Sequence, residues 1–160
     1  MIKELMLVGL LSSNLNADAE CLALNIYYEA RNQPLAGKLA VASVVINRVN
    51  DERFPNTICE VVYQGPTRPS WKGTGELIPI RNKCQFSWYC DGKSDIPLEL
   101  NQFNSIYDLS IDIIETNVFN LDITDGATHY HADYVTPSWA SSKTKTVEIE
   151  DHIFYRWDYP

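Results

Sequence analysis

Glu29 is the residue of this sequence whose type and position best suit acid chemistry. It lies on the edge of a predicted apolar stripe at helical spacing, formed by Leu22, Ile26 and Ala30. A carboxyl group held against apolar and aromatic neighbours loses hydration, so its pKa should rise. An acid still protonated near neutral pH can give its proton to a leaving oxygen. In the alternative interpretation, Glu29 pairs with Arg31 or another arginine and only joins elements together.

Three histidines offer a second kind of chemistry. On a strand, His129 and His131 would point both imidazoles to one face, and His152 or Asp133 would complete a conceivable zinc site. No His-x-Glu or His-Glu-x-x-His spacing completes a metal motif, however. We therefore interpret His129 and His131 as substrate-contacting or hydrogen-bonded residues, and we predict no metal and no other cofactor.

Polar and aromatic side chains gather in segments that we expect to be loops. They are Gln85, Ser87, Trp88 and Tyr89 between two cysteines, with Trp71, Tyr134 and Trp139 elsewhere. Aromatic faces beside amides and hydroxyls suit sugars, which offer apolar C–H patches and hydroxyl edges. The alternative is that several of these aromatics, Trp88 above all, belong to the core. Ser87 is not in a Gly-x-Ser-x-Gly elbow, which gives a serine hydrolase little support.

The elements that must position these residues follow from periodicity and turn signals. We predict helices over residues 17 or 18 to 31, 35–50, 58–63 and 98–117, with Pro34 opening the second and Asn56 or Thr57 capping the third. Residues 64–83 contain three prolines and three glycines and predict a long loop. A strand over 127–133 and a hairpin of 144–149 with 153–157, turning at 150–151, complete an α+β domain.

Length and charge limit the classes of partner. With 160 residues, 45% of them hydrophobic, the chain suits one well-buried domain, which we place at residues 20–160 and expect to be a monomer. The net charge of -8, with only 13 Lys and Arg, argues against a nucleic-acid partner. No run approaches the roughly 20 apolar residues of a membrane span, so we expect no stable membrane insertion.

The N-terminus and the cysteines bear on export. Residues 1–19 contain a short apolar run and end in Ala17-Asp18-Ala19, which predicts either a secretory signal peptide or a short N-terminal helix. Four cysteines allow three disulfide connectivities. In an exported protein we favour Cys84–Cys90 with Cys21–Cys59, and the alternative is four reduced, buried thiols. In either case a cysteine nucleophile paired with His129 or His131 has little support.

Several motifs occur together in a fixed order. They are Tyr28-Glu29-Ala30-Arg31, Val41-Ala42-Ser43-Val44-Val45-Ile46-Asn47-Arg48-Val49, Arg53-Phe54-Pro55-Asn56-Thr57-Ile58-Cys59-Glu60-Val61-Val62, Cys84-Gln85-Phe86-Ser87-Trp88 and Ala127-Thr128-His129-Tyr130-His131. The combination resembles the cell wall hydrolase family of the spore cortex-lytic enzyme SleB, in its Gram-negative and phage branch. The resemblance covers residues 21–157.

The resemblance implies a lysozyme-like α+β fold and a peptidoglycan hydrolase that cuts between N-acetylmuramic acid and N-acetylglucosamine. The family glutamate maps onto Glu29. The family's cleft walls map onto Gln85, Phe86 and Ser87 and onto His129, Tyr130 and His131, and we add Trp139 as a sugar contact. One departure is Gln33, where the family more often has an acidic residue before the proline, and this puts the pH optimum in doubt. We expect an exported enzyme, either a phage endolysin or an envelope-remodelling enzyme.

The number of carboxylates decides between two mechanisms. Hydrolysis of this bond usually needs two, and the candidates Asp91, Asp95 and Asp133 lie beside turn or loop residues. A single acid is enough for a lytic transglycosylase, in which the sugar's own 6-hydroxyl displaces the leaving group, so we favour that activity. The alternatives are a metal-dependent amidase using His129 and His131, and a wall-binding module without activity.

Overall fold

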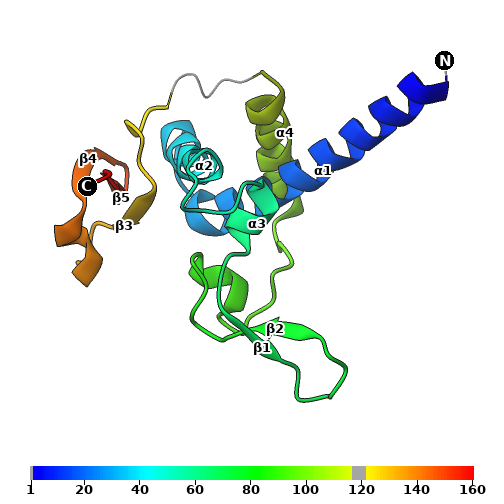
Figure 1. The fold of residues 1–160 in the computed structure, drawn as a ribbon. Coiled ribbons are helices and arrows are strands. Elements are labelled where there is room, and N and C mark those ends of the chain that lie inside the picture. The colour runs from blue at the N-terminus through cyan, green and yellow to red at the C-terminus, as the bar shows by residue number, and fades with distance from the viewer. Residues whose placement is uncertain (1, 117–121) are drawn as a thin grey trace.

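The computed structural model describes the backbone of residues 2–116 and 122–160 and, within these, the side chains of residues 14–115 and 122–160. It has the predicted α+β architecture, a helical body with small antiparallel sheets (Figure 1). The helices are α1 (Ile2–Ala30), α2 (Leu35–Val49), α3 (Ile58–Val62) and α4 (Leu100–Thr116), with short 3-10 turns η1 (Ser87–Cys90) and η3 (Ser138–Ser142). The strands are β1 (Thr67–Pro69), β2 (Leu77–Pro79), β3 (His129–Ala132), β4 (Thr144–Ile149) and β5 (His152–Arg156).

The helical body is built around the stripe that the sequence predicts on α1. Leu22, Ile26 and Ala30 are all buried in the main hydrophobic cluster. The helix begins at Ile2, well before the predicted start at residue 17 or 18, and continues without interruption to Ala30. Residues 2–16 contain no proline, so none of them lacks the N–H that a continuous helix needs. None of the helices in the described part of the chain is long and apolar enough to cross a membrane.

Helix α2 is the central element, as predicted. Its Val41, Ala42 and Val45 belong to the main cluster with α1, α3 and α4. Its Ala40 and Val44 form a second, smaller cluster with Ala127 and Phe154 of the sheet region. Because its residues are small or β-branched, neighbouring elements approach it closely on both sides. The helix therefore connects the helical body to the sheet.

The other helix boundaries lie within two residues of the predictions. Asn50 and Tyr63 become the C-terminal caps of α2 and α3, and Thr57 caps α3 by accepting a hydrogen bond from the Glu60 N–H (3.2 Å). The fourth helix begins at Leu100, whereas its predicted end at Asn117 lies outside the described residues. The predicted strand over 127–133 is shorter, at His129–Ala132, and the predicted hairpin is present as β4 and β5.

Residues 64–83 are not the structureless loop that the sequence predicts. They contain a two-stranded hairpin, with Arg68 opposite Ile78 and Pro69 opposite Leu77. Prolines normally argue against a strand because they cannot donate to the ladder. In a two-stranded hairpin both strands are edges, so a proline can lie at the end of each one. Gly73 and Gly75 take positive φ values of 67° and 75° and turn the chain between the strands.

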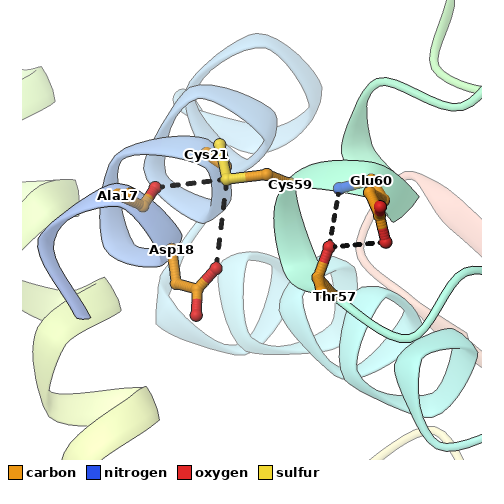
Figure 2. The surroundings of a disulfide bond; sticks show 6 residues. All are labelled: Ala17, Asp18, Cys21, Thr57, Cys59 and Glu60. Carbon is orange, nitrogen blue, oxygen red and sulfur yellow. Dashed lines mark hydrogen bonds between the residues drawn. A yellow bond between two sulfur atoms is a disulfide. The ribbon is translucent and has the colours of Figure 1, made fainter. Parts of the chain in front are cut away.

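Both favoured disulfides are present, which rules out four reduced thiols. Cys21–Cys59 joins α1 to α3 (Figure 2). The Cys59 sulfur also lies 3.4 Å from the Ala17 carbonyl oxygen, a polar contact and not a hydrogen bond because a disulfide sulfur carries no hydrogen. Cys84–Cys90 closes a short loop that includes η1, and the Cys84 N–H points at the Cys90 sulfur at 3.1 Å.

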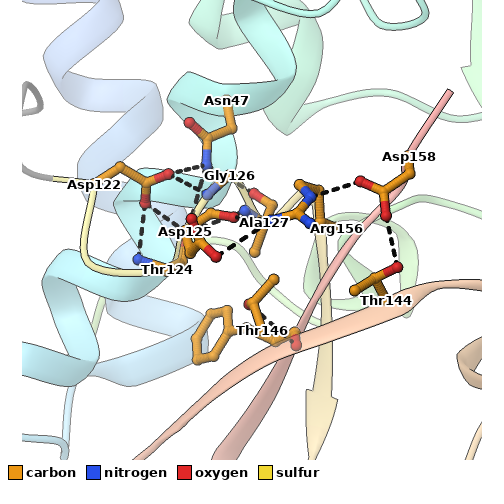
Figure 3. A network of polar contacts seen from close by, with 11 residues as sticks. Asn47, Asp122, Thr124, Asp125, Gly126, Ala127, Thr144, Thr146, Arg156 and Asp158 are labelled. Atoms are coloured by element: carbon orange, nitrogen blue, oxygen red, sulfur yellow. Dashed lines mark hydrogen bonds and ion pairs between the residues drawn. The ribbon is translucent and has the colours of Figure 1, made fainter.

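The three-stranded sheet, in the order β3-β5-β4, is attached to α2 by a polar network (Figure 3). The Asn47 amide donates to Asp122 Oδ2 (2.9 Å) and to the Ala127 carbonyl (2.9 Å). Asp122 also accepts from the Thr124 hydroxyl (2.6 Å) and the Gly126 N–H (2.6 Å). These bonds fix the segment that leads into β3.

Candidate active site

A cleft of about 490 Å³ opens between the helical body, the Cys84–Cys90 loop and the sheet. Three groups of residues that we name as walls make up most of its lining. The helical wall is Tyr28, Glu29 and Arg48, the loop wall is Gln85, Phe86, Ser87 and Trp88, and the sheet wall is His129, Tyr130, His131 and His152. Trp139 of η3 lies at its edge. The structure thus brings together Glu29 and the seven residues predicted to contact the substrate, whereas Trp71 and Tyr89 are absent from the lining.

Glu29 lies in the last turn of α1, half-buried, with its carboxylate facing the cleft. The Tyr130 hydroxyl donates a 2.8 Å hydrogen bond to its Oε2 atom. Burial raises the pKa of Glu29, and the bond from Tyr130 and the nearby charge of Arg48 oppose that rise only in part. No ion pair in the described part of the chain involves Glu29, and Arg31 instead lies over the ring of Tyr27 at 5.0 Å. Among the described residues, the structure therefore does not contain the ion pair of the alternative interpretation.

Arg48 also lines the cleft, and the sequence reasoning did not name it as a site residue. Its guanidinium lies between the rings of Phe54 (5.0 Å) and Phe86 (5.2 Å), and its Nε atom donates to the Thr128 carbonyl at 2.7 Å. It is 5% exposed, and burial lowers its pKa to about 10, so it keeps its charge at neutral pH. The sequence could have indicated Arg48, because it is a charged residue within a largely apolar predicted helix. Charged side chains are rarely buried unless they are paired or hydrogen-bonded.

His129 and His131 lie on one side of β3, as predicted, with both rings within 6 Å of the Trp139 ring (5.3 and 5.7 Å). Burial, with the nearby charges of Arg48, Lys143 and Arg53, lowers the pKa of His129 to about 3. This imidazole is therefore neutral at physiological pH. It offers hydrogen bonds to a ligand without adding charge to the cleft.

His131 is held by two hydrogen bonds of its own. Its Nδ1 donates to the Ala132 carbonyl (2.7 Å), and its Nε2 meets the Tyr155 hydroxyl (2.9 Å). Both nitrogens are thus engaged, which leaves no free lone pair for a metal. Within the residues whose side chains are described, no three His, Cys, Asp or Glu are grouped so as to hold a metal ion. The donor set does not favour the metal-dependent alternative.

A second missed feature connects Gln33 to the acid. The Gln33 amide nitrogen lies 3.2 Å from His152 Nδ1, and the His152 ring packs on Tyr130 at 4.8 Å between centroids. Burial lowers the pKa of His152, so the pair is neutral. The Gln33 Oε1 atom is buried without a partner in the described part of the chain. The contacts thus run from Gln33 through His152 and Tyr130 to Glu29, and the first two of these residues are 119 positions apart in the sequence.

Some residues of the loop wall are exposed in the cleft, and others are buried in the core. Gln85 and Ser87 are exposed towards the cleft, whereas Phe86 packs beneath Arg48 and is buried. Trp88 is buried too, stacked on Tyr28 at 4.8 Å, and its indole N–H donates to Asn25 Oδ1 (2.9 Å). This confirms the interpretation of Trp88 as a core residue.

Glu29 is the one carboxylate among the described residues that line the cleft. The alternatives named from the sequence, Asp91, Asp95 and Asp133, are absent from that lining, and Asp133 is exposed. The arrangement is therefore one acid of raised pKa facing neutral hydrogen-bonding groups. An acid in such a setting can donate a proton to a molecule bound in the cleft and can recover one from it.

Residues 32–155 match a family model described as Cell Wall Hydrolase. Among curated relatives, the spore cortex-lytic enzyme of Halalkalibacterium halodurans is 26% identical over 138 residues, which cover 86% of this chain and 34% of the relative. That of Bacillus subtilis is 41% identical over 49 residues, 31% of this chain and 16% of the relative. The chain thus spans about a third of the length of the Halalkalibacterium halodurans relative.

Two solved structures are similar over nearly all of their length. The catalytic domain of the Bacillus cereus SleB protein has a TM-score of 0.57 and 26% identity, covering 87% of this chain and 89% of that one. The catalytic domain of the germination-specific lytic transglycosylase SleB from Bacillus anthracis has a TM-score of 0.61 and 26% identity, covering 87% and 93%.

Proposed function

Because the chain belongs to the cell wall hydrolase family and has its lysozyme-like α+β fold, we propose that it cleaves the glycan strand of peptidoglycan between N-acetylmuramic acid and N-acetylglucosamine. We infer further that it acts as a lytic transglycosylase with Glu29 as its acid and base. The observation that carries this proposal is a single carboxyl group of raised pKa in a cleft whose other described lining residues are not acidic. A similar structure is itself named a lytic transglycosylase.

The proposed reaction has two proton transfers at one group. Protonated Glu29 gives its proton to the glycosidic oxygen as the bond from that oxygen to the muramic acid C1 breaks, and the N-acetylglucosamine side departs as an alcohol. The Glu29 carboxylate then takes the proton from the 6-hydroxyl of the same muramic acid as that oxygen bonds to C1. The product carries a 1,6-anhydro ring, and Glu29 is again protonated.

Neighbouring groups support the two states of the acid. Tyr130 can donate to Oε2 whether Glu29 is protonated or ionised, which leaves the other oxygen to face the substrate. The buried cation of Arg48 favours the carboxylate that forms after the first proton transfer. Gln85, Ser87 and the neutral His129 offer hydrogen bonds to sugar hydroxyl and acetamido groups, and Trp139 offers an aromatic face.

The experiment that tests this proposal is mass spectrometry of the soluble products from purified peptidoglycan. The wild type is compared with Glu29→Gln and with Glu20→Gln, a matched change at an exposed position of the same helix. We expect anhydro-muropeptides from the wild type and from Glu20→Gln. Loss of the general acid should slow Glu29→Gln by about 10²–10⁴-fold or more.

Other products would overturn the proposal in distinct ways. Reducing-end muropeptides would mean hydrolysis, and with it a second carboxylate that acts on a water. Free stem peptides that disappear with a chelator would indicate a metal-dependent amidase at His129 and His131. Binding to the wall without any soluble product would indicate a wall-binding module. Undiminished lysis by a folded Glu29→Gln variant would remove Glu29 from the mechanism.

The same reasoning extends to where the enzyme works. We propose that it is exported, with residues 1–19 as the segment that directs export, and that it acts as a monomer on glycan strands outside the cytoplasm. Two disulfides suit an oxidising environment. An N-terminal sequence of the protein recovered from the producing cell envelope tests the first part, because cleavage is expected before Glu20.

A further inference from the structure

The hairpin of β1 and β2 and the loop that follows it differ in charge from the rest of the molecule. Residues 67–93 carry five of the chain's 13 Lys and Arg but only two of its 21 Asp and Glu. The five cations are exposed, and they are Arg68, Lys72, Arg81, Lys83 and Lys93. None of them takes part in an ion pair within the described part of the chain. A locally basic surface therefore lies on a protein whose net charge is -8.

An exposed tryptophan stands at the turn of this hairpin. Trp71 is 82% exposed, and the side-chain contact found for it is with Lys72, whose Nζ lies 6.0 Å from the ring centroid. Leu77 across the hairpin is 63% exposed. Gly73 and Gly75, which turn the chain beside Trp71, have no atoms near the position that a Cβ would occupy. The tip thus stands in open space, and the hairpin points away from the helical body (Figure 1).

The base of the hairpin is joined to the loop wall of the cleft. The Gln85 N–H donates to the Gln64 carbonyl just before β1 (2.9 Å), and the Asn82 N–H donates to the Cys90 carbonyl (2.9 Å). The Arg81 guanidinium lies against Gly92. A molecule held by the hairpin would therefore be held beside the cleft wall.

We propose that this basic hairpin, residues 67–81 with Trp71 at its turn, is a second contact surface for peptidoglycan, separate from the cleft. The inference rests on the proposed function, since it takes the same polymer as the ligand. Peptidoglycan offers apolar sugar faces that match an exposed indole, and carboxylates on its stem peptides that match Arg68 and Lys72. Large exposed apolar side chains flanked by charge are typical of contact surfaces.

Charge explains why such a surface is needed. A protein of net charge -8 is repelled by a polymer rich in carboxylates, and an unpaired basic hairpin offsets that repulsion at one place. Such attraction between exposed charges is screened by salt, because the Debye length falls to about 3 Å at 1 M. The contact should therefore weaken with ionic strength, while stacking on Trp71 persists.

The test is sedimentation with insoluble purified peptidoglycan, using the full chain with Glu29→Gln so that binding is measured without cleavage. We expect Trp71→Ala, and separately Arg68→Gln with Lys72→Gln, to weaken binding about tenfold or more, which is the usual cost of truncating a contact-surface anchor. Trp71→Tyr should keep most of the affinity. Matched exposed changes away from the hairpin, Leu98→Ala and Lys145→Gln, should leave binding unchanged.

A second measurement separates this inference from the proposed function. With Glu29 intact, hairpin variants should cleave short soluble glycan fragments at the wild-type rate and lose about tenfold on intact peptidoglycan. If neither the wild type nor any variant cleaves either substrate, the proposed function is wrong, and the sedimentation experiment still tests the contact surface by itself. Equal binding by Trp71→Ala and wild type would overturn the inference. So would tighter binding to phosphatidylglycerol vesicles or to DNA than to peptidoglycan.

Discussion

The helical wall and the sheet wall of the cleft are held in place very differently. Glu29 extends from a helix whose buried face is part of the main hydrophobic cluster, and Cys21–Cys59 joins that helix to α3. The sheet wall meets the helices through a smaller cluster of four buried residues, through the polar network around Asn47, and through single hydrogen bonds such as that from Tyr130 to Glu29. The acid is thus fixed by the core, whereas the groups that face it depend on a few specific bonds.

The two walls also differ in charge. The helical wall holds the ionisable acid and the cation of Arg48. On the sheet wall, burial lowers the pKa of His129 and His152 and raises that of Tyr130 well above its usual range, so these three groups are uncharged at neutral pH. Under the proposed mechanism, proton transfer would take place on the wall that the core fixes, and hydrogen bonding to the sugar on the wall that fewer contacts hold.

Opening the two disulfides in turn gives the largest expected contrast. Cys21–Cys59 spans 38 residues inside the helical body, so the variant with Cys21→Ser and Cys59→Ser should lose about 4 kcal/mol of unfolding free energy by the chain-entropy model. Cys84–Cys90 spans only six residues, and its opening should cost about 2 kcal/mol. Urea unfolding followed by circular dichroism measures both.

Activity should show the opposite order. At a temperature where both variants are folded, opening Cys84–Cys90 should reduce the cleavage rate more, since that bond closes the loop carrying Gln85 and Ser87. Opening Cys21–Cys59 should leave the rate near wild type. Equal losses of activity would mean that the loop wall does not depend on its own disulfide.

Tyr130→Phe removes the hydrogen bond that connects the two walls. A hydrogen bond to the carboxylate favours its charged form, so without it the pKa of Glu29 should rise further. The fall in activity on the alkaline side, which follows ionisation of Glu29, should then move to higher pH. We also expect about a tenfold lower rate, close to the value of one hydrogen bond to a charged group. Rates across pH 4 to 9 test this, and an alkaline limb moved to lower pH would contradict it.

The smallest expected effect concerns the anchoring of the sheet at low pH. Burial alone would raise the pKa of Asp122, but hydrogen bonds from Thr124, Asn47 and Gly126 outweigh it and lower the pKa below its usual value. Because the pKa of Asp122 is lower in the folded protein, its ionisation stabilises the fold at any pH above the pKa of the unfolded chain, about 3.9. This stabilisation is lost as the pH falls through the lower pKa of the folded protein. Wild type should therefore lose more stability than Asp122→Asn between pH 5 and 2, as thermal unfolding can measure. Parallel losses would show that Asp122 does not contribute.

Local sequence patterns were enough to predict the position of Glu29 and most of the helices. Leu22, Ile26 and Ala30 repeat at the spacing of one helix face, so the position of Glu29 beside the core follows from the sequence alone. The predicted hairpin of β4 and β5 is present for a similar reason, since alternation is a property of adjacent residues. The two disulfides were favoured among three connectivities, and the structure contains both.

What the sequence left out depends on contacts between distant residues. Arg48 donates a hydrogen bond to the carbonyl of Thr128, which is 80 positions away in the sequence. No local pattern predicts that contact. The role of Gln33 beside His152 arises only when β5 is folded against the start of α2. The hairpin at 67–79 was missed because its prolines argue against a strand, although they are tolerated where both strands are edges.

The disulfide that closes the short loop between Cys84 and Cys90 makes one wall of the cleft depend on the redox conditions around the protein. Cells keep thiols reduced in the cytoplasm and oxidise them outside it. A chain still inside the producing cell would have this loop open, and with it one wall of the cleft loosened. If the protein is exported as proposed, the bond would form outside the cytoplasm, so the proposed lytic activity would mature at its target and spare the cell during synthesis.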